Sequence, residues 1–102
     1  TFFRLGPALE THPLFPERTN VEFARVLPDG RLKLRTWERG CGETLSCATG
    51  SAAALVAAKL CGQAGERAFV MQNAGELLVE QSKDGNVFVT GDTRIVFSGY
   101  TD

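Results

Sequence analysis

A cysteine at the start of a segment of small residues is the feature of this sequence best suited to chemistry. Cys47 is followed by Ala48, Thr49 and Gly50, and then by an alanine-rich stretch over 51–60 that predicts a helix. The first turn of a helix has about four unpaired backbone N–H groups and carries about half a positive charge. This environment stabilises a thiolate and binds carboxylate or phosphate groups. The pattern therefore predicts an anion-binding catalytic site.

Three polar residues upstream are further candidates for this site. Glu38 and Arg39 end a predicted strand, and Asn20 follows a proline-rich loop. In the functional interpretation, Arg39 or Glu38 faces the pocket and binds the charged groups of an amino-acid-like ligand. In the structural interpretation, Glu38 and Arg39 form a surface ion pair that contributes little to stability. Asn20 is then a turn residue, and Thr49 caps the helix. Residue types and spacing leave both interpretations open.

For the other two cysteines and the single histidine, the sequence gives weaker evidence of a functional role. Cys61 ends the apolar helix and is predicted to be buried and inert. Cys41 lies between two glycines, in a loop with nothing nearby to activate it, and His12 is predicted to be a surface residue. The spacing matches no zinc site, so we expect no metal. An odd number of cysteines argues against a disulfide framework and is typical of a cytoplasmic protein.

Length and composition narrow the class of protein. The 102 residues predict one domain over 1–102, and 43% apolar with 23% charged residues is typical of a folded domain. Eleven basic and twelve acidic residues give a net charge of −1, which argues against nucleic-acid binding. No apolar run reaches the about 18 residues of a membrane span, and no signal-peptide pattern opens the chain. The start at Thr1 suggests a piece of something longer.

The periodicity of apolar residues predicts the elements around Cys47. Strands over 21–27 and 32–38, joined by a Pro-Asp-Gly turn, form a hairpin; 39–46 is a loop, and a helix over 48–61 ends at Gly62. That helix is apolar nearly all round and is therefore expected to be buried. Further strands are predicted over 1–5, 68–72, 76–81, 87–90 and 93–97, with a helical turn over 7–11. The expected fold is α+β, a mostly antiparallel curved sheet or partial barrel wrapped around one central buried helix.

The segment around Cys47 closely resembles the second active-site motif of the diaminopimelate epimerases. The matching residues are Trp37-Glu38-Arg39-Gly40-x-Gly42-Glu43-Thr44-x-x-Cys47-x-Thr49-Gly50. The run over 6–21 resembles the stretch just upstream of that motif in the family. Position 48, often glycine in the motif, is alanine here, which matters little if its contact is through the backbone N–H. The resemblance covers essentially the whole chain.

The resemblance implies a cofactor-independent amino-acid epimerase of two similar halves, with the substrate in the cleft between them. One cysteine from each half faces the substrate α-carbon: one removes the α-proton as thiolate, and the other returns a proton as thiol. By this match Cys47 is the catalytic cysteine of the C-terminal half. Substrate-contacting positions fall on Asn20, Glu38, Arg39, Ala48 and Thr49. No cofactor or metal is implied.

Nothing in the chain resembles the first motif of the family, which carries the partner cysteine. The resemblance therefore implies a C-terminal half whose partner is a missing N-terminal half, and which is inactive alone. Its exposed apolar surface predicts self-association, such as a homodimer. Two alternatives stay open: a related two-cysteine racemase for another amino acid, and a non-catalytic binding module that keeps the fold.

Overall fold

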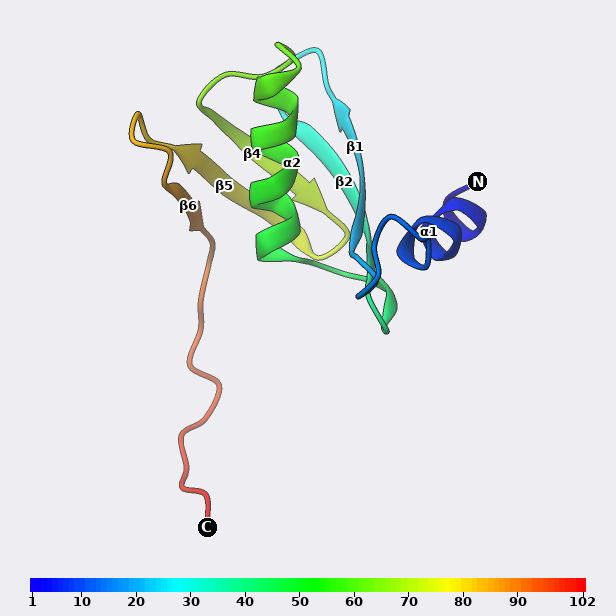
Figure 1. Cartoon of the computed structure of the whole chain (residues 1–102). Coiled ribbons are helices and arrows are strands. Elements are labelled where there is room, and N and C mark those ends of the chain that lie inside the picture. Colours follow the sequence, from blue (N-terminus) through cyan, green and yellow to red (C-terminus); the bar gives the residue numbers. More distant parts are fainter.

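A six-stranded sheet and two helices make up the computed structural model, which describes residues 1–102 (Figure 1). The strands are β1 (Val21–Val26), β2 (Leu32–Glu38), β3 (Gly42–Thr44), β4 (Arg67–Gln72), β5 (Gly75–Gln81) and β6 (Val87–Thr90), and the helices are α1 (Phe2–Glu10) and α2 (Ala48–Leu60). The predicted α+β class is confirmed. None of the helices is both long and apolar enough to span a bilayer.

The sheet consists of two antiparallel groups of strands. Its order is β1-β2-β4-β5-β6, and β3 also pairs with β2, so that β1, β2 and β3 form one group and β4, β5 and β6 the other. A parallel pairing of β2 with β4, limited to Leu32↔Val70 and Lys33↔Met71, joins the groups. Helix α2 makes the connection between them and lies across one face of the sheet (Figure 1). The antiparallel pairings follow the prediction, whereas the parallel link was not predicted.

The hairpin of β1 and β2 confirms the prediction from the Pro-Asp-Gly turn. Its register runs from Val21↔Trp37 to Val26↔Leu32. Gly30 has φ +89°, a left-handed conformation that favours glycine. The side chain of Asp29 closes the turn by accepting a hydrogen bond from the Arg31 N–H at 3.1 Å. The turn is therefore held by the same residue types that predicted it.

The core lies between α2 and the inner face of the sheet. It consists of Leu32, Leu34, Ala54, Leu55, Ala68, Val70 and Val79. Helix α2 was expected to be buried, and it is buried on the side that carries Ala54 and Leu55, whereas Ala53, Ala57 and Leu60 are exposed. The sheet covers one side of the helix, and a cavity of ≈ 310 Å³ lies between α2 and the edge strand β1.

The strand predicted over 1–5 is wrong, because residues 2–5 belong to α1 and Thr1 is its N-cap. The buried residues of α1 are Phe2, Gly6 and Glu10, which are spaced by four and therefore share one face of a helix. This face packs on the side of β1 and β2 that points away from α2, with the Phe2 ring 4.9 Å from that of Phe23. Gly6 permits the contact, since a Cβ there would lie 2.8 Å from the Trp37 ring. The helix runs through the turn predicted over 7–11 and includes Pro7.

Two further predictions need correction. The segment 39–46 contains the short strand β3, which pairs with the end of β2. The predicted strand over 93–97 does not form, and the chain after β6 runs away from the sheet without pairing (Figure 1). Ile95 and Phe97 are 90% and 85% exposed. A short run of apolar residues forms a strand only if a neighbouring strand is available, and no strand lies beside this segment.

Candidate active site

Cys47 occupies the N-cap of α2, and its side chain faces the first turn of the helix. The residue has an extended backbone and is 8% exposed. Its Sγ accepts a hydrogen bond from the Gly50 N–H at 3.3 Å and lies 3.5 Å from Thr49 Oγ1. A sulfur atom that accepts hydrogen bonds from a helix N-terminus can carry negative charge there. The predicted position of Cys47 at the start of a helix is confirmed.

The backbone of Cys47 is fixed by Gln72, at the end of β4. Gln72 Oε1 accepts a hydrogen bond from the Cys47 N–H at 3.1 Å, and Gln72 Nε2 donates to the Cys47 carbonyl at 3.3 Å. Ser51 Oγ donates to the same carbonyl at 2.9 Å. Sequence reasoning missed Gln72, because nothing in the local pattern shows that β4 ends beside the start of α2. The cysteine is thus held from two elements.

The first two residues of α2 leave donors free. The N–H groups of Ala48 and Thr49 make no hydrogen bond within the chain, and both residues are exposed. They precede the first ladder bond of the helix, Ser51 N–H to the Cys47 carbonyl at 3.0 Å. Two adjacent free N–H groups at a helix N-terminus are suited to bind a carboxylate.

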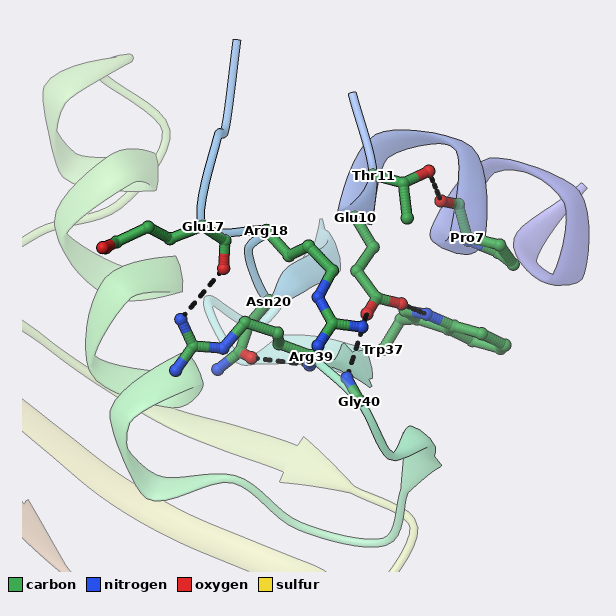
Figure 2. A network of polar contacts seen from close by, with 9 residues as sticks. All are labelled: Pro7, Glu10, Thr11, Glu17, Arg18, Asn20, Trp37, Arg39 and Gly40. Atoms are coloured by element: carbon green, nitrogen blue, oxygen red, sulfur yellow. Dashed lines mark hydrogen bonds and ion pairs between the residues drawn. The ribbon is translucent and has the colours of Figure 1, made fainter. Parts of the chain in front are cut away.

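A cavity of ≈ 370 Å³ lies next to these donors and brings several candidate residues together. Asn20, Arg39 and Thr49 line it, whereas Glu38 and Ala48, the chain neighbours of the last two, do not. Asn20 Oδ1 accepts a hydrogen bond from the Arg39 N–H at 2.8 Å, and the Arg39 guanidinium donates to the Glu17 carbonyl at 3.2 Å (Figure 2). The cavity therefore has a guanidinium group and an amide on one side and the start of α2 on the other.

Glu10 connects α1 to the segment that carries Arg39. Its carboxylate accepts hydrogen bonds from Trp37 Nε1 at 2.8 Å and from the Gly40 N–H at 2.9 Å, and Arg18 Nη1 lies 3.6 Å away (Figure 2). The hydrogen bond from Gly40, then that from Trp37, and then the charge of Arg18 hold the pKa of Glu10 below its usual value. The contacts of Glu10 are therefore with residues on both sides of Arg39.

Glu22, on β1, is a second residue that sequence reasoning missed. It lines the same cavity, is half-buried, and its Oε1 has no hydrogen-bond partner. Burial raises the pKa of Glu22, and the negative charge of Glu38 raises it further. The alternation of a strand could have found it, because residues 20 and 22 point to the same face.

The remaining cysteines and the histidine differ in part from expectation. Cys41 is exposed, as predicted, but Cys61 is exposed as well, so the prediction that it is buried is wrong. Cys61 is the C-cap of α2 and borders the cavity between α2 and β1. His12 is exposed, as predicted. No group of three or more histidine, cysteine or acidic residues has the arrangement of a metal site.

The sequence of the chain is similar to those of known proteins. A model of the diaminopimelate epimerase family matches residues 1–96. The chain belongs to this family. It is 51% identical over 96 residues to the diaminopimelate epimerase of Phocaeicola vulgatus, covering 93% of this chain and 34% of that protein. It is 49% identical over 98 residues to that of Pelotomaculum thermopropionicum, covering 96% and 35%.

Two further comparisons concern the share of each relative that the chain matches and the fold. The diaminopimelate epimerase of Methanococcus maripaludis is 44% identical over 100 residues, which are 97% of this chain and 36% of that protein. This family member thus spans about a third of the length of the relatives it matches. A PhzF-family phenazine biosynthesis protein from Bacillus anthracis has a similar fold, with a TM-score of 0.62 at 16% identity over 87% of this chain and 29% of that one. That likeness concerns the fold alone.

Proposed function

We propose that residues 1–102 form the C-terminal domain of a diaminopimelate epimerase, in which Cys47 is one of two cysteines that exchange the α-proton of the substrate. The observation that carries the proposal is the position of Cys47 Sγ, 3.3 Å from the Gly50 N–H and beside the free N–H groups of Ala48 and Thr49. A sulfur that must accept and return a proton is thereby next to donors for the carboxylate attached to the reacting carbon.

The reaction needs two groups because the configuration of the α-carbon is inverted. The thiolate of one cysteine takes the α-proton, so that an S–H bond forms and the electron pair of the broken C–H bond remains on the substrate. The thiol of the other cysteine then gives its proton to the opposite face. The N–H groups of Ala48 and Thr49, together with the Arg39 guanidinium, would stabilise the negative charge that develops. This chain supplies Cys47, and the partner cysteine belongs to the N-terminal half.

The substrate contacts proposed for this half are Asn20, Glu38, Arg39, Ala48 and Thr49. Arg39 and Asn20 border the cavity beside α2, which supports binding of an amino acid with a second charged group. A racemase for another amino acid would use the same two thiols and differ in the residues around the substrate side chain. A non-catalytic binding module would keep the cavity without proton exchange.

The test is incorporation of solvent deuterium at the α-carbon of diaminopimelate by the full-length protein. We expect Cys47→Ala to lower the exchange rate by about 10²- to 10⁴-fold, the usual contribution of a positioned acid or base. Cys41→Ala and Cys61→Ala are matched controls, because both thiols are exposed, and neither change should affect the rate. Undiminished exchange in Cys47→Ala would remove Cys47 from the mechanism.

The same assay tests the need for two halves. The isolated chain should not exchange the α-proton, because one thiol reaches one face of the carbon and the open site leaves the carbanion in water. Mixing it with the N-terminal half should restore exchange that depends on Cys47. Clear exchange by the isolated chain would refute this half-site argument. Exchange with another amino acid in place of diaminopimelate would favour the racemase, and absence of exchange with any would favour the binding module.

A further inference from the structure

Three polar side chains form a row across neighbouring strands beneath the start of α2. In the strand register, Glu22 of β1 is paired with Thr36 of β2, and Thr36 with Thr44 of β3. Directly paired residues point to the same face of a sheet. The oxygens Glu22 Oε1, Thr36 Oγ1 and Thr44 Oγ1 are all buried and lack hydrogen-bond partners. Thr36 is 2% exposed, so its hydroxyl has no access to bulk water.

A second carboxyl group lies beside this row, on β2. Glu38 follows Thr36 by two positions on β2 and therefore shares its face of the sheet. Burial raises the pKa of the Glu22 carboxyl, and the negative charge of Glu38 raises it further. No lysine or arginine forms an ion pair with either group. Two neighbouring carboxylates without a cation repel each other, and this repulsion is relieved when one of them takes up a proton or when a cationic group binds between them.

The fit of Glu22 against α2 is close. A Cβ on Gly50 would lie 2.5 Å from Glu22 Oε1 and 3.0 Å from its Cδ, so that glycine is what lets the carboxyl group lie against the first helical turn. The same turn carries Thr49, which lines the cavity together with Glu22. The carboxyl group thus belongs to the wall of this cavity.

We propose that Glu22 is a specificity-determining residue that accepts a hydrogen bond from an ammonium group of the bound amino acid, and that the nearby charge of Glu38 adds to the attraction. The cavity then offers donors for a carboxylate, at Arg39 and the start of α2, and acceptors for an ammonium group, at Glu22. That combination fits the zwitterionic end of an amino acid. The inference rests on the proposed function for the identity of the ligand and goes beyond it in assigning a residue to the ammonium group.

The test compares two ligands that differ in their amino groups alone. Diaminopimelate and pimelate have the same carbon chain and the same two carboxylates, but pimelate has no ammonium group. Dissociation constants are measured by calorimetry on the full-length protein, for the wild type, Glu22→Gln and Glu66→Gln. Glu66 is the matched control, because it is exposed and loses the same charge.

We expect Glu22→Gln to weaken diaminopimelate binding by about 10- to 100-fold, the range for a hydrogen bond to a charged group. Pimelate binding should be unchanged or tighter, since a repelling carboxylate is removed, and Glu66→Gln should affect neither ligand. Because a glutamine side chain has the same shape as that of glutamate, the melting temperature of Glu22→Gln without ligand should not fall. Glu22→Asp, which retains the charge, should recover part of the affinity.

Each other result overturns the inference in a recognisable way. Equal weakening of both ligands would mean that Glu22 only shapes the cavity. Unchanged diaminopimelate binding would mean that the row merely holds ordered water. Proton exchange is measured separately. If the wild-type protein exchanges the α-proton and Glu22→Gln binds diaminopimelate with normal affinity, this inference alone is refuted. If the wild-type protein prefers diaminopimelate to pimelate through Glu22 but does not exchange the α-proton, the proposed function alone is refuted. If the wild-type protein does not bind diaminopimelate, both the inference and the proposed function are refuted.

Discussion

At the scale of single residues, Glu10 shows how one carboxylate can organise a site that it does not line. It receives the indole N–H of Trp37 and the backbone N–H of Gly40, and both donors flank the segment that carries Arg39. These hydrogen bonds favour the charged carboxylate, which explains why the pKa of Glu10 is lowered. The position of Arg39 therefore depends on a charge carried by α1.

Glu10→Gln should make stability less dependent on acid pH. A carboxyl group with a lowered pKa in the folded protein contributes stability above its ordinary pKa of about 4.5, and this contribution is lost as pH falls through the lowered value. We expect the wild-type protein to melt at a higher temperature than Glu10→Gln at pH 7, and the difference to shrink on acidification. Thermal melts of the full-length proteins from pH 7 to pH 3 measure this.

Glu17→Gln is the matched control for that experiment. Glu17 is exposed, and its backbone carbonyl rather than its carboxylate accepts the hydrogen bond from Arg39. This substitution should leave the melting temperature unchanged at every pH. A gap between wild type and Glu10→Gln that stayed constant down to pH 3 would show that the charge of Glu10 is not what matters.

Parts of the geometry of the candidate site could be predicted from the sequence because they depend on local patterns. The place of Cys47 and Thr49 at a helix start could be predicted because the helix is visible in the run of alanines that follows. Arg39 and Asn20 were candidates from their residue types and places in the sequence, and the resemblance to the family implied that they contact the substrate. Gln72 was missed because its role depends on where β4 ends in space.

At the scale of elements, the start of α2 is attached to β4 through Gln72. The amide side chain of Gln72 makes hydrogen bonds with both the N–H and the carbonyl of Cys47. Ser46 Oγ also donates to Gln72 Oε1, at 2.7 Å. These contacts fix the helix at the end that carries the thiol. The arrangement predicts that the reactivity of Cys47 depends on a strand from the other group of the sheet.

Gln72→Leu should therefore impair both stability and proton exchange. The N–H of Cys47 would lose its partner in a partly buried site, which costs about 1–3 kcal/mol of unfolding free energy. In the exchange assay we expect kcat to fall more than KM rises, because the thiol moves while the cavity beside Arg39 is retained. Urea unfolding and steady-state exchange by the full-length protein measure the two effects.

Gln63→Leu provides the comparison, since Gln63 is exposed and its side chain makes no hydrogen bond. It should leave both quantities near the wild-type values. A Gln72→Leu protein with normal kcat would show that the attachment to β4 serves the fold and not the thiol.

Elements with strong local patterns were the ones that sequence analysis predicted well. The hairpin of β1 and β2 has a turn of defined chemistry, and α2 has both a start and an end signal. The segment 1–5 was too short for its period to be recognised, and α1 becomes evident when Gly6 and Glu10 are seen to share its buried face. The segment 93–97 has the β-branched and aromatic residues of a strand but pairs with no strand of the sheet.

At the scale of the whole molecule, the chain matches one part of larger relatives. It covers about a third of their length and contains one cysteine at a helix start. The apolar side chains of Ile95, Val96 and Phe97 are exposed beyond β6. Self-association of the isolated chain, such as a homodimer, remains a prediction from this surface.

The narrow parallel link between the two groups of strands has a consequence for the order of folding. Each group pairs strands that are close in sequence, whereas Leu32↔Val70 closes a loop that contains all of β3 and α2. Local pairings form before those that close long loops, and a helix as short as α2 gains most of its stability by packing. In pulse-labelled hydrogen exchange during refolding of the full-length protein, amides of β1–β2 and β4–β5 should be protected first. Protection of α2 and of the Val70 amide should follow together, so the helix that carries Cys47 forms when the two groups of strands meet. Earlier protection of α2 would contradict this order.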